Sequence, residues 1–328
     1  MKHNVAIVYG GYSSEAVVSE KSMAGLLTFI DTERYNLIPV LVSRSEWSAV
    51  IDGEHYTIDR ADFSFVRNGV KVNIDFAYIT IHGAPGENGQ LPGYFEMIGL
   101  PHSTCPALTS AMTFDKYVCN SYLRGFGINV ADSALVRRGE KVDAAAIAQK
   151  LGLPCFVKPA AAGSSFGVSK VKRAEDIVPA VEKAMTESDT VVIESFLDGT
   201  EVTCGLYKTA QRTVIFPLTE VVSANEFFDY EAKYTAGGAQ EITPARVPDA
   251  VRDQVQATAS RVYDIMNMKG IARIDFIITR DRICLLEVNT TPGMTVTSFI
   301  PQQIRANGMQ AKDVFTEVID DILTRSKR

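Results

Sequence analysis

Two segments near the C-terminus have the apolar composition of buried strands and yet carry acidic side chains. The stretch ARIDFIITRDRICLLEVNTTPGM, residues 272–294, sets Asp275, Glu287 and Asn289 among isoleucine, leucine, phenylalanine and valine. Burying an unpaired carboxylate is costly unless a basic partner or a metal ion is present. We therefore expect a fold in which these two strands face a cation.

The spacing of these side chains predicts how they meet. Side chains alternate across a strand, so Glu287 and Asn289 share one face. A turn at residues 280–282 places Asp275 directly opposite Glu287, so three oxygen donors converge. Such a set suits Mg²⁺, which typically takes one or two carboxylates and adds substrate phosphates. The alternative is an exposed face of ordinary acids. Arg273 is either their ion-pair partner or a group that stabilises charge beside the metal.

A glycine-rich segment, CFVKPAAAGSSFGVSKV at residues 155–171, indicates phosphate binding. Lys158 interrupts an apolar run and needs an anionic partner. The backbone N–H groups of residues 163–167 can converge on one anion. The alternative is a mobile surface hairpin with a lysine whose stem lies along apolar surface. The chain contains no Walker A pattern, and its first turn does not match the dinucleotide-binding glycine pattern.

Composition and charge narrow the class of protein. The 328 residues suit about two or three domains. The net charge of −6, without long runs of either sign, argues against a nucleic-acid surface. No apolar run approaches the roughly 20 residues of a membrane helix. The N-terminus has the pattern of a first strand, and the scattered cysteines suggest reduced thiols. We expect a cytoplasmic protein with no nucleic-acid or membrane partner.

The order of elements predicts a mainly α/β chain. Strands alternating with helices up to about residue 103 favour a parallel sheet, whose ligands lie beyond the carboxyl ends of the strands. That places Glu15 and His82 at a candidate site. Antiparallel strands dominate the last third. The polar, aromatic segment at 225–240 is long for a connection, which is typical of a lid.

The motifs together resemble a known family. YGGYSSE, HGAPGENG, TFDKY, FVKPAAAGSSFGVSKV, IESFLDGTEVT, FFDYEAKY, ARIDF and LLEVNTTPGMTVTS occur in the order found in D-alanine–D-alanine ligases of the ATP-grasp superfamily. The resemblance covers nearly the whole chain. It implies a three-domain ATP-grasp fold: an N-terminal parallel α/β domain at 1–103, and α+β domains at 104–198 and 199–328 that clamp ATP. The lid at about 225–240 belongs to the last domain.

The resemblance also implies an activity. This activity is the ATP-dependent joining of two D-alanines through a D-alanyl phosphate, which supplies peptidoglycan precursors. The implied cofactors are two Mg²⁺ ions, which Mn²⁺ can replace. The implied oligomer is a homodimer. Ligases that take D-lactate or D-serine as second substrate are the nearest rivals, and Tyr234 favours D-alanine over D-lactate. The alternative from a non-enzyme class is a two-lobed protein that only binds a small molecule. Binding alone does not need a strand face that carries metal ligands.

Residue roles follow from the same resemblance. The nucleotide residues are the phosphate contacts Lys116, Lys158, Ser165 and Lys233, the adenine strand Glu194, Ser195, Phe196 and Leu197, and the ribose acid Glu201. The metal ligands are Asp275, Glu287 and Asn289. Glu15 holds the ammonium of the first D-alanine, and Ser298 contacts the carboxylate of the second. His82 lies near the first substrate, and the equal alternative is a structural histidine at a strand end. Arg273 and the N–H of Gly293 form the oxyanion site, while Ser164 and Tyr234 fasten the lid to Glu15.

The chain departs from the family pattern in four places. Ala16-Val17 follow Glu15, Ala161-Ala162 precede the glycine loop, Ser195 replaces a common lysine, and Phe299 replaces the usual leucine after Ser298. None removes a reacting group. Phe299 bears on the second-substrate pocket, where it is expected to shape binding.

Overall fold

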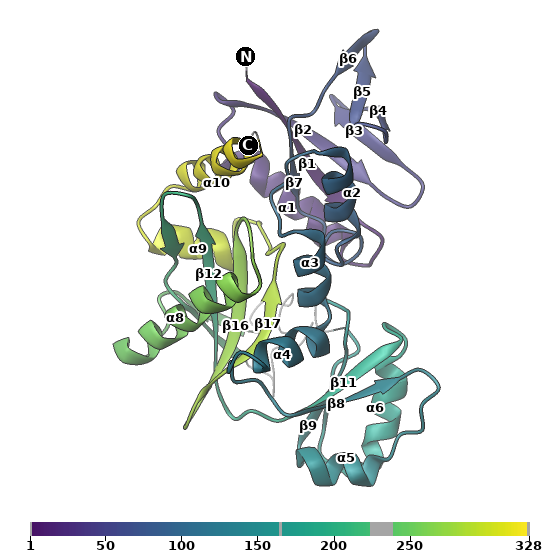
Figure 1. The fold of residues 1–328 in the computed structure, drawn as a ribbon, viewed down its shortest axis with the longest axis vertical. Coiled ribbons are helices and arrows are strands. Elements are labelled where there is room, and N and C mark those ends of the chain that lie inside the picture. Colours follow the sequence, from purple (N-terminus) through teal and green to yellow (C-terminus); the bar gives the residue numbers. More distant parts are fainter. Residues whose placement is uncertain (1, 164–165, 224–238, 327–328) are drawn as a thin grey trace.

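The computed structural model describes residues 2–163, 166–223 and 239–326 (Figure 1). Its described strands form three sheets, and each sheet draws its strands from one continuous part of the chain. The strands of each sheet fall within one of the ranges 1–103, 104–198 and 199–328. Those domain limits themselves remain a prediction.

The first sheet has the strand order β6-β5-β4-β3-β2-β1-β7. Its strands are β1 His3–Gly10, β2 Tyr35–Val42, β3 Trp47–Ile51, β4 Glu54–Asp59, β5 Ser64–Arg67, β6 Val70–Val72 and β7 Phe76–Ile79. The predicted parallel core is confirmed, because β1 pairs in parallel with both β2 and β7. Strands β3 to β6 extend it with antiparallel pairs, which the sequence analysis did not anticipate. Helices α1 (Ala16–Phe29) and α2 (Gln90–Ile98) follow β1 and β7.

Two helices lead from the first sheet to the second (Figure 1). They are α3 (Ala107–Phe114) and α4 (Lys116–Arg124), and Asp115 caps α4 because its side chain accepts a hydrogen bond from the N–H of Val118. The second sheet runs β10-β9-β11-β8. Its elements are β8 Ser133–Arg137, α5 Ala144–Leu151, β9 Cys155–Pro159, β10 Ser169–Val171, a 3₁₀ turn at Ala174–Asp176, α6 Ile177–Ala184 and β11 Thr190–Ser195.

The third sheet runs β15-β14-β12-β16-β17, and β13 also pairs with β12. The strands are β12 Gly199–Lys208, β13 Thr213–Ile215, β14 Thr219–Ser223, β15 Ala239–Ile242, β16 Ala272–Thr279 and β17 Ile283–Asn289. Its pairs are antiparallel, as predicted. The helices are α8 Asp249–Ile265, α9 Phe299–Ala306 and α10 Ala311–Arg325.

The C-terminal helix joins the two ends of the chain. In α10, Phe315 and Ile319 pack in one buried cluster with Val5 and Ile7 of β1. The phenol of Tyr35 donates a 2.6 Å hydrogen bond to Asp320 on the same helix. The third sheet is therefore anchored to the first through packed side chains, which fixes one wall of the space between them. No described helix is long and apolar enough to cross a membrane.

Candidate active site

A cavity of about 720 Å³ lies where the parts of the chain meet. This volume is within the range of ligand pockets in proteins. The cavity brings together most of the predicted site residues, from α1, the loop after β7, α4, β12, β16, β17 and the start of α9. The predicted residues that line it are Glu15, His82, Lys116, Glu201, Arg273, Asp275, Glu287, Asn289, Gly293, Ser298 and Phe299.

In the acidic hairpin, formed by β16 and β17, the predicted residues face each other, but the strand register near the turn differs from the prediction. Asp275 stands opposite Glu287, as expected. At the turn, however, Ile278 pairs with Ile283, one residue out of the predicted register. A register shift between Asp275 and Phe276 restores the alignment. A bulge of this kind re-aims side chains and is common beside active sites.

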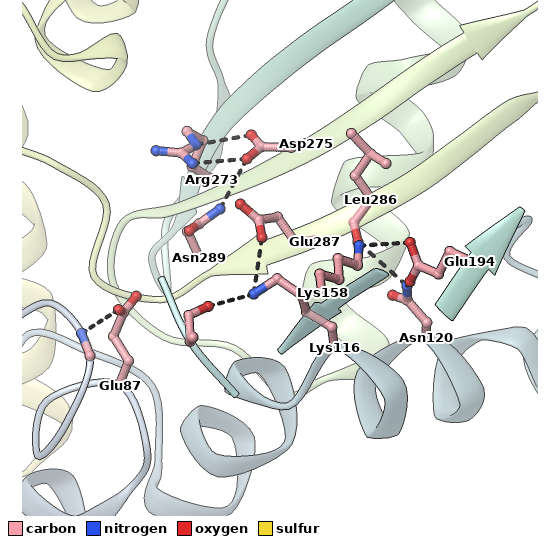
Figure 2. Close-up of polar contacts among 12 residues, drawn as sticks. Glu87, Lys116, Asn120, Lys158, Glu194, Arg273, Asp275, Leu286, Glu287 and Asn289 are labelled. Carbon is pink, nitrogen blue, oxygen red and sulfur yellow. Dashed lines mark hydrogen bonds and ion pairs between the residues drawn. The ribbon is translucent and has the colours of Figure 1, made fainter. Parts of the chain in front are cut away.

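Charge around the hairpin is balanced by close pairing (Figure 2). The Nε and Nη2 of Arg273 donate to the two carboxylate oxygens of Asp275 at 2.9 and 2.8 Å. The side-chain amide of Asn289 donates to Asp275 at 3.1 Å. Burial alone lowers the pKa of Arg273, but the adjacent Asp275 carboxylate outweighs it, so the pKa is raised and the guanidinium stays charged.

The oxygen donors fit a magnesium site that substrate phosphates complete. Asp275, Glu287 and Asn289 supply two carboxylates and an amide oxygen to one cavity wall. Across the described residues, no group of three His, Cys, Asp or Glu side chains is arranged to hold a metal. Mg²⁺ bound through few protein ligands and through substrate phosphates fits them.

Two predicted phosphate-binding lysines are each paired with an acid (Figure 2). Lys116 Nζ lies 3.4 Å from Glu287 and donates a 2.7 Å hydrogen bond to the carbonyl of Ala162. Lys158 Nζ lies 2.6 Å from Glu194. These ammonium groups are only partly exposed, so a carboxylate partner offsets the cost of desolvating them. An arriving phosphate would compete with these acids for the lysines.

The glycine-rich loop lies directly against the predicted first-substrate acid. A Cβ atom built on Gly163 would lie 2.5 Å from both carboxylate oxygens of Glu15. Real Cβ atoms do not approach that closely, so the loop reaches Glu15 only because residue 163 is glycine. Glu15 itself is buried just before α1. The predicted phosphate loop and the predicted ammonium site therefore border each other.

His82 lines the cavity and also takes part in a bridge between α1 and the loop that carries Gly293. Its Nε2 lies 3.3 Å from the Ser22 hydroxyl, and Ser22 also accepts a 3.3 Å hydrogen bond from the N–H of Met294. Burial lowers the pKa of His82 to about 4, so the ring is neutral at pH 7. Ser22, which the sequence analysis did not single out, links the first domain to the loop that carries Gly293. Its place two turns into α1 gave no signal.

Glu87 is a further acid in the cavity, and it was given no role from the sequence. It lies in the HGAPGENG motif and accepts a 2.7 Å hydrogen bond from the N–H of Gly83 (Figure 2). Burial, followed by the nearby Glu15 charge, raises the pKa of Glu87 to about 8. A strongly perturbed carboxyl in a cavity is a frequent mark of a functional site. Its position five residues after His82 was the available signal.

The predicted adenine strand lies beside the cavity but does not line it. The Glu194 carboxylate lies near Asn120. The side-chain amide of Asn120 is 3.4 Å from both Glu194 and the Leu286 carbonyl of the acidic hairpin (Figure 2). Ser195 accepts a 3.2 Å hydrogen bond from the N–H of Asp132. The Phe196 ring lies under the Lys170 ammonium, 4.4 Å from its centroid. Leu197 follows as a half-buried residue.

Several predicted residues lie outside the described part of the chain. They are Ser164 and Ser165 of the glycine loop, and Lys233 and Tyr234 of the proposed lid. The lid prediction for 225–240 therefore concerns mainly residues that the structure does not describe. Ser298, directly before α9, lies within the described part, and its hydroxyl accepts a 3.0 Å hydrogen bond from the N–H of Thr295.

The fold and the site define the chain as an enzyme of the ATP-grasp class, with a glycine-rich loop and an acidic hairpin at one cavity. Family models give the relationship more closely. The D-ala D-ala ligase N-terminus model matches residues 4–105, and the D-ala D-ala ligase C-terminus model matches residues 122–320. The chain belongs to the D-alanine–D-alanine ligase family, which confirms the resemblance found in the sequence.

Individual relatives are similar to this chain over nearly the full length of both proteins. A D-alanine–D-alanine ligase from Phocaeicola vulgatus is 58% identical, covering 98% of this chain and 99% of the relative. One from Parabacteroides distasonis is 54% identical, covering 100% and 99%. Among solved structures, D-alanyl-alanine synthetase A from Vibrio cholerae is 28% identical with a TM-score of 0.89, covering 98% and 99%. The VanG D-Ala:D-Ser ligase from Enterococcus faecalis is also 28% identical, with a TM-score of 0.88, covering 98% and 100%.

Proposed function

We propose that this enzyme joins two D-alanine molecules into D-alanyl-D-alanine, with ATP as the energy source, for the synthesis of peptidoglycan precursors. The observation that carries the proposal is one cavity in which Arg273, Asp275, Glu287 and Asn289 face Glu15. Membership of the family supports ATP and a divalent metal ion as requirements. Two Mg²⁺ ions, replaceable by Mn²⁺, remain the finer part of the proposal, as do a homodimer and a cytoplasmic location.

The chemistry explains why these side chains share a cavity. A carboxylate is a poor acyl donor, so the γ-phosphoryl group of ATP is transferred to the first D-alanine carboxylate and ADP leaves. The amine of the second D-alanine then attacks the acyl carbon, and inorganic phosphate leaves. Metal ions held at Asp275, Glu287 and Asn289 would neutralise charge on the phosphoryl group.

The chain's own side chains position the reactants. Glu15, buried at the end of the cavity formed by the first domain, would hold the ammonium of the first D-alanine. Lys116 and Lys158 would exchange their acidic partners for ATP phosphates. The Arg273 guanidinium and the N–H of Gly293 would stabilise the oxyanion formed when the second amine attacks, since fixed donors act strongly in a dry site.

At the second-substrate pocket, Ser298 would contact the carboxylate of the second D-alanine. The fold does not separate D-alanine from D-serine as second substrate, because the similar VanG structure is a D-Ala:D-Ser ligase. Sequence identity favours D-alanine, because the relatives at 54% and 58% identity are D-alanine–D-alanine ligases. Tyr234, in the segment that the structure does not describe, is the further sequence basis for preferring D-alanine over D-lactate.

One competition assay tests the proposal. The purified enzyme receives ATP, Mg²⁺ and D-alanine, with equal D-serine or D-lactate, at pH 7. Phosphate release and the product mixture are measured together. We expect phosphate release that depends on D-alanine, and D-alanyl-D-alanine as the main product. A predominance of D-alanyl-D-lactate or D-alanyl-D-serine would contradict the choice of second substrate, and no dipeptide or ester at all would contradict a ligase.

A further inference from the structure

Arg273 is held on two sides by two different residues. Asp275 grips one edge of the guanidinium through Nε and Nη2, which leaves Nη1 as the nitrogen that Asp275 does not hold. The aromatic ring of Phe299 lies against the guanidinium, with the Arg273 Cζ 5.3 Å from the ring centroid. A desolvated arginine over an aromatic face is attracted by the electron density of the ring. Phe299 is also one of the four departures from the family pattern.

The ring of Phe299 is fixed in place by the helix that carries it. Phe299 begins α9, and Gln303 lies one turn later on the same side. The fully buried Gln303 accepts a 2.9 Å hydrogen bond from the N–H of Gly205 and donates a 3.0 Å bond to the carbonyl of Thr203. In the sheet, Gly205 is the register partner of Arg273 on the neighbouring strand. Helix α9 is thus bonded to the sheet right beside Arg273.

Close packing leaves α9 little freedom to shift. A Cβ atom built on Gly205 would lie 2.4 Å from both the Gln303 side-chain oxygen and the Cδ1 of Ile300. The helix therefore approaches the strand as near as a glycine allows. The place of the Phe299 helix beside the Arg273 backbone is consequently set by contacts that do not involve the Asp275 carboxylate.

Under the proposed function, Asp275 would share its carboxylate between Arg273 and a metal ion. That sharing would weaken the two hydrogen bonds that Arg273 now donates to it. We propose that Phe299 is a positioning residue that keeps the Arg273 guanidinium oriented when Asp275 is engaged by metal. This inference rests on the proposed function, in which Asp275 binds metal and Arg273 stabilises the oxyanion of the second step.

Substitutions at Phe299 distinguish two roles for this residue. In the proposed role the ring orients Arg273, which is called the brace below, and in the other role it only lines the second-substrate pocket. Phe299→Leu and Phe299→Met keep an apolar side chain and remove the ring, and Phe299→Tyr keeps the ring as the matched control. For the two ring-less variants we expect kcat for dipeptide formation to fall about tenfold, the order of a cation–π contact. KM for the second D-alanine should stay within about twofold. The amount of phosphate released per dipeptide formed should rise. When attack by the second D-alanine is slower, more of the acyl phosphate is hydrolysed by water.

A spectroscopic measurement tests the brace without turnover. The Nε–H signal of Arg273, assigned by its loss in Arg273→Lys, is recorded without metal and then with Mg²⁺ and a non-hydrolysable ATP analogue. In Phe299→Leu and Phe299→Met it should be sharp without metal and broaden on loading. In the wild type and Phe299→Tyr it should stay sharp in both states. Having two ring-less variants keeps the test valid if one of them fails to fold.

The outcomes are distinct. Unchanged kcat together with a sharp loaded signal in the ring-less variants would overturn the brace. A rise in KM alone would show that Phe299 is only a wall of the pocket, which also overturns it. If the wild type forms no dipeptide, the proposed function fails, while the loaded and unloaded signals still decide whether the ring restrains Arg273.

Discussion

The Ser22 hydroxyl lies 3.3 Å from the imidazole Nε2 of His82 and 3.3 Å from the backbone nitrogen of Met294. Because the Met294 N–H donates to Ser22, the Ser22 hydroxyl has its own proton available for His82 Nε2. Either neutral tautomer of His82 can make this hydrogen bond, because a hydroxyl both donates and accepts. This chain of hydrogen bonds ties α1 and the loop after β7 to the loop that carries Gly293.

His82 should make the protein sensitive to mild acid. Its pKa is lowered by burial from 6.5 to about 4, so the unfolded chain binds a proton between these values and the folded chain does not. Folding stability from this group is therefore complete above pH 6.5 and falls as the pH drops toward 4. The loss between pH 7 and pH 5 should be about 2 kcal/mol. Urea unfolding at both pH values measures it.

The matched variant is His82→Gln, which keeps a polar group and does not titrate. It should be less stable than the wild type at pH 7 but lose about 2 kcal/mol less on going to pH 5. His102, whose pKa burial lowers to about 3, remains in both proteins and contributes equally. The same pH dependence in both proteins would contradict a buried, neutral His82.

Glu87 should have the opposite effect on stability. Burial raises the pKa of Glu87 from 4.5 to about 8, so the folded state holds a proton that the unfolded state releases between these values. Stability is therefore lost as the pH rises through this window. Glu87→Gln mimics the protonated carboxyl and should gain about 2 kcal/mol relative to the wild type between pH 5 and pH 7. Parallel stability curves for the two proteins across that window would show that Glu87 is ionised in the folded state.

Gly25 sets the contact between α1 and the loop that carries Gly293. A Cβ atom built there would lie 2.1 Å from the carbonyl oxygen of Met294, so Gly25→Ala must push the two backbones apart. Overpacking of this kind typically costs about 1–3 kcal/mol. It should also lower turnover, because it displaces the loop that carries Gly293, the proposed oxyanion donor. Thermal unfolding and steady-state rates measure both effects.

Gly93 offers the control for that substitution. It also lies in a helix, α2, but its built Cβ atom comes only within 3.4 Å of the Ala107 side chain. Gly93→Ala should therefore leave turnover unchanged and raise stability slightly, by up to about 1 kcal/mol. If both alanine variants behaved alike, the close approach at Gly25 would not be the cause.

The sequence predicted much of this site because local patterns determine local geometry. Alternation along two strands was enough to bring Asp275, Glu287 and Asn289 to one wall, since side-chain direction has a period of two residues. The exact path was not predictable. Near the turn, the observed strand register differs by one residue from the predicted register, and a bulge further along restores the predicted pairing. The place of such a bulge depends on hydrogen bonds in the turn and on packing against neighbouring strands.

Contacts between distant segments were beyond such patterns. Nothing near Ser22 in the sequence indicates that its hydroxyl meets both His82 and Met294, which lie 60 and 272 residues away. Glu87 was visible in a motif, but its raised pKa depends on burial and on Glu15. The antiparallel strands β3 to β6 were missed as well, although they lie away from the cavity and do not alter it.

Removing one charge at a time from the acidic hairpin tests the metal site. Asp275→Asn and Glu287→Gln each keep a similar shape and replace a carboxylate by an amide, which is a weaker ligand for Mg²⁺. Each should lower turnover by at least about a hundredfold, because the metal's stabilisation of phosphoryl charge amounts to several kcal/mol.

Glu220→Gln is the control, since Glu220 is also buried in this sheet but pairs with Arg246 at 2.8 Å. It should lose stability and keep its turnover. Rates across a Mg²⁺ titration, with circular dichroism to verify folding, separate these effects. Near-normal Mg²⁺-dependent turnover in both hairpin variants would show that Asp275 and Glu287 do not bind the metal.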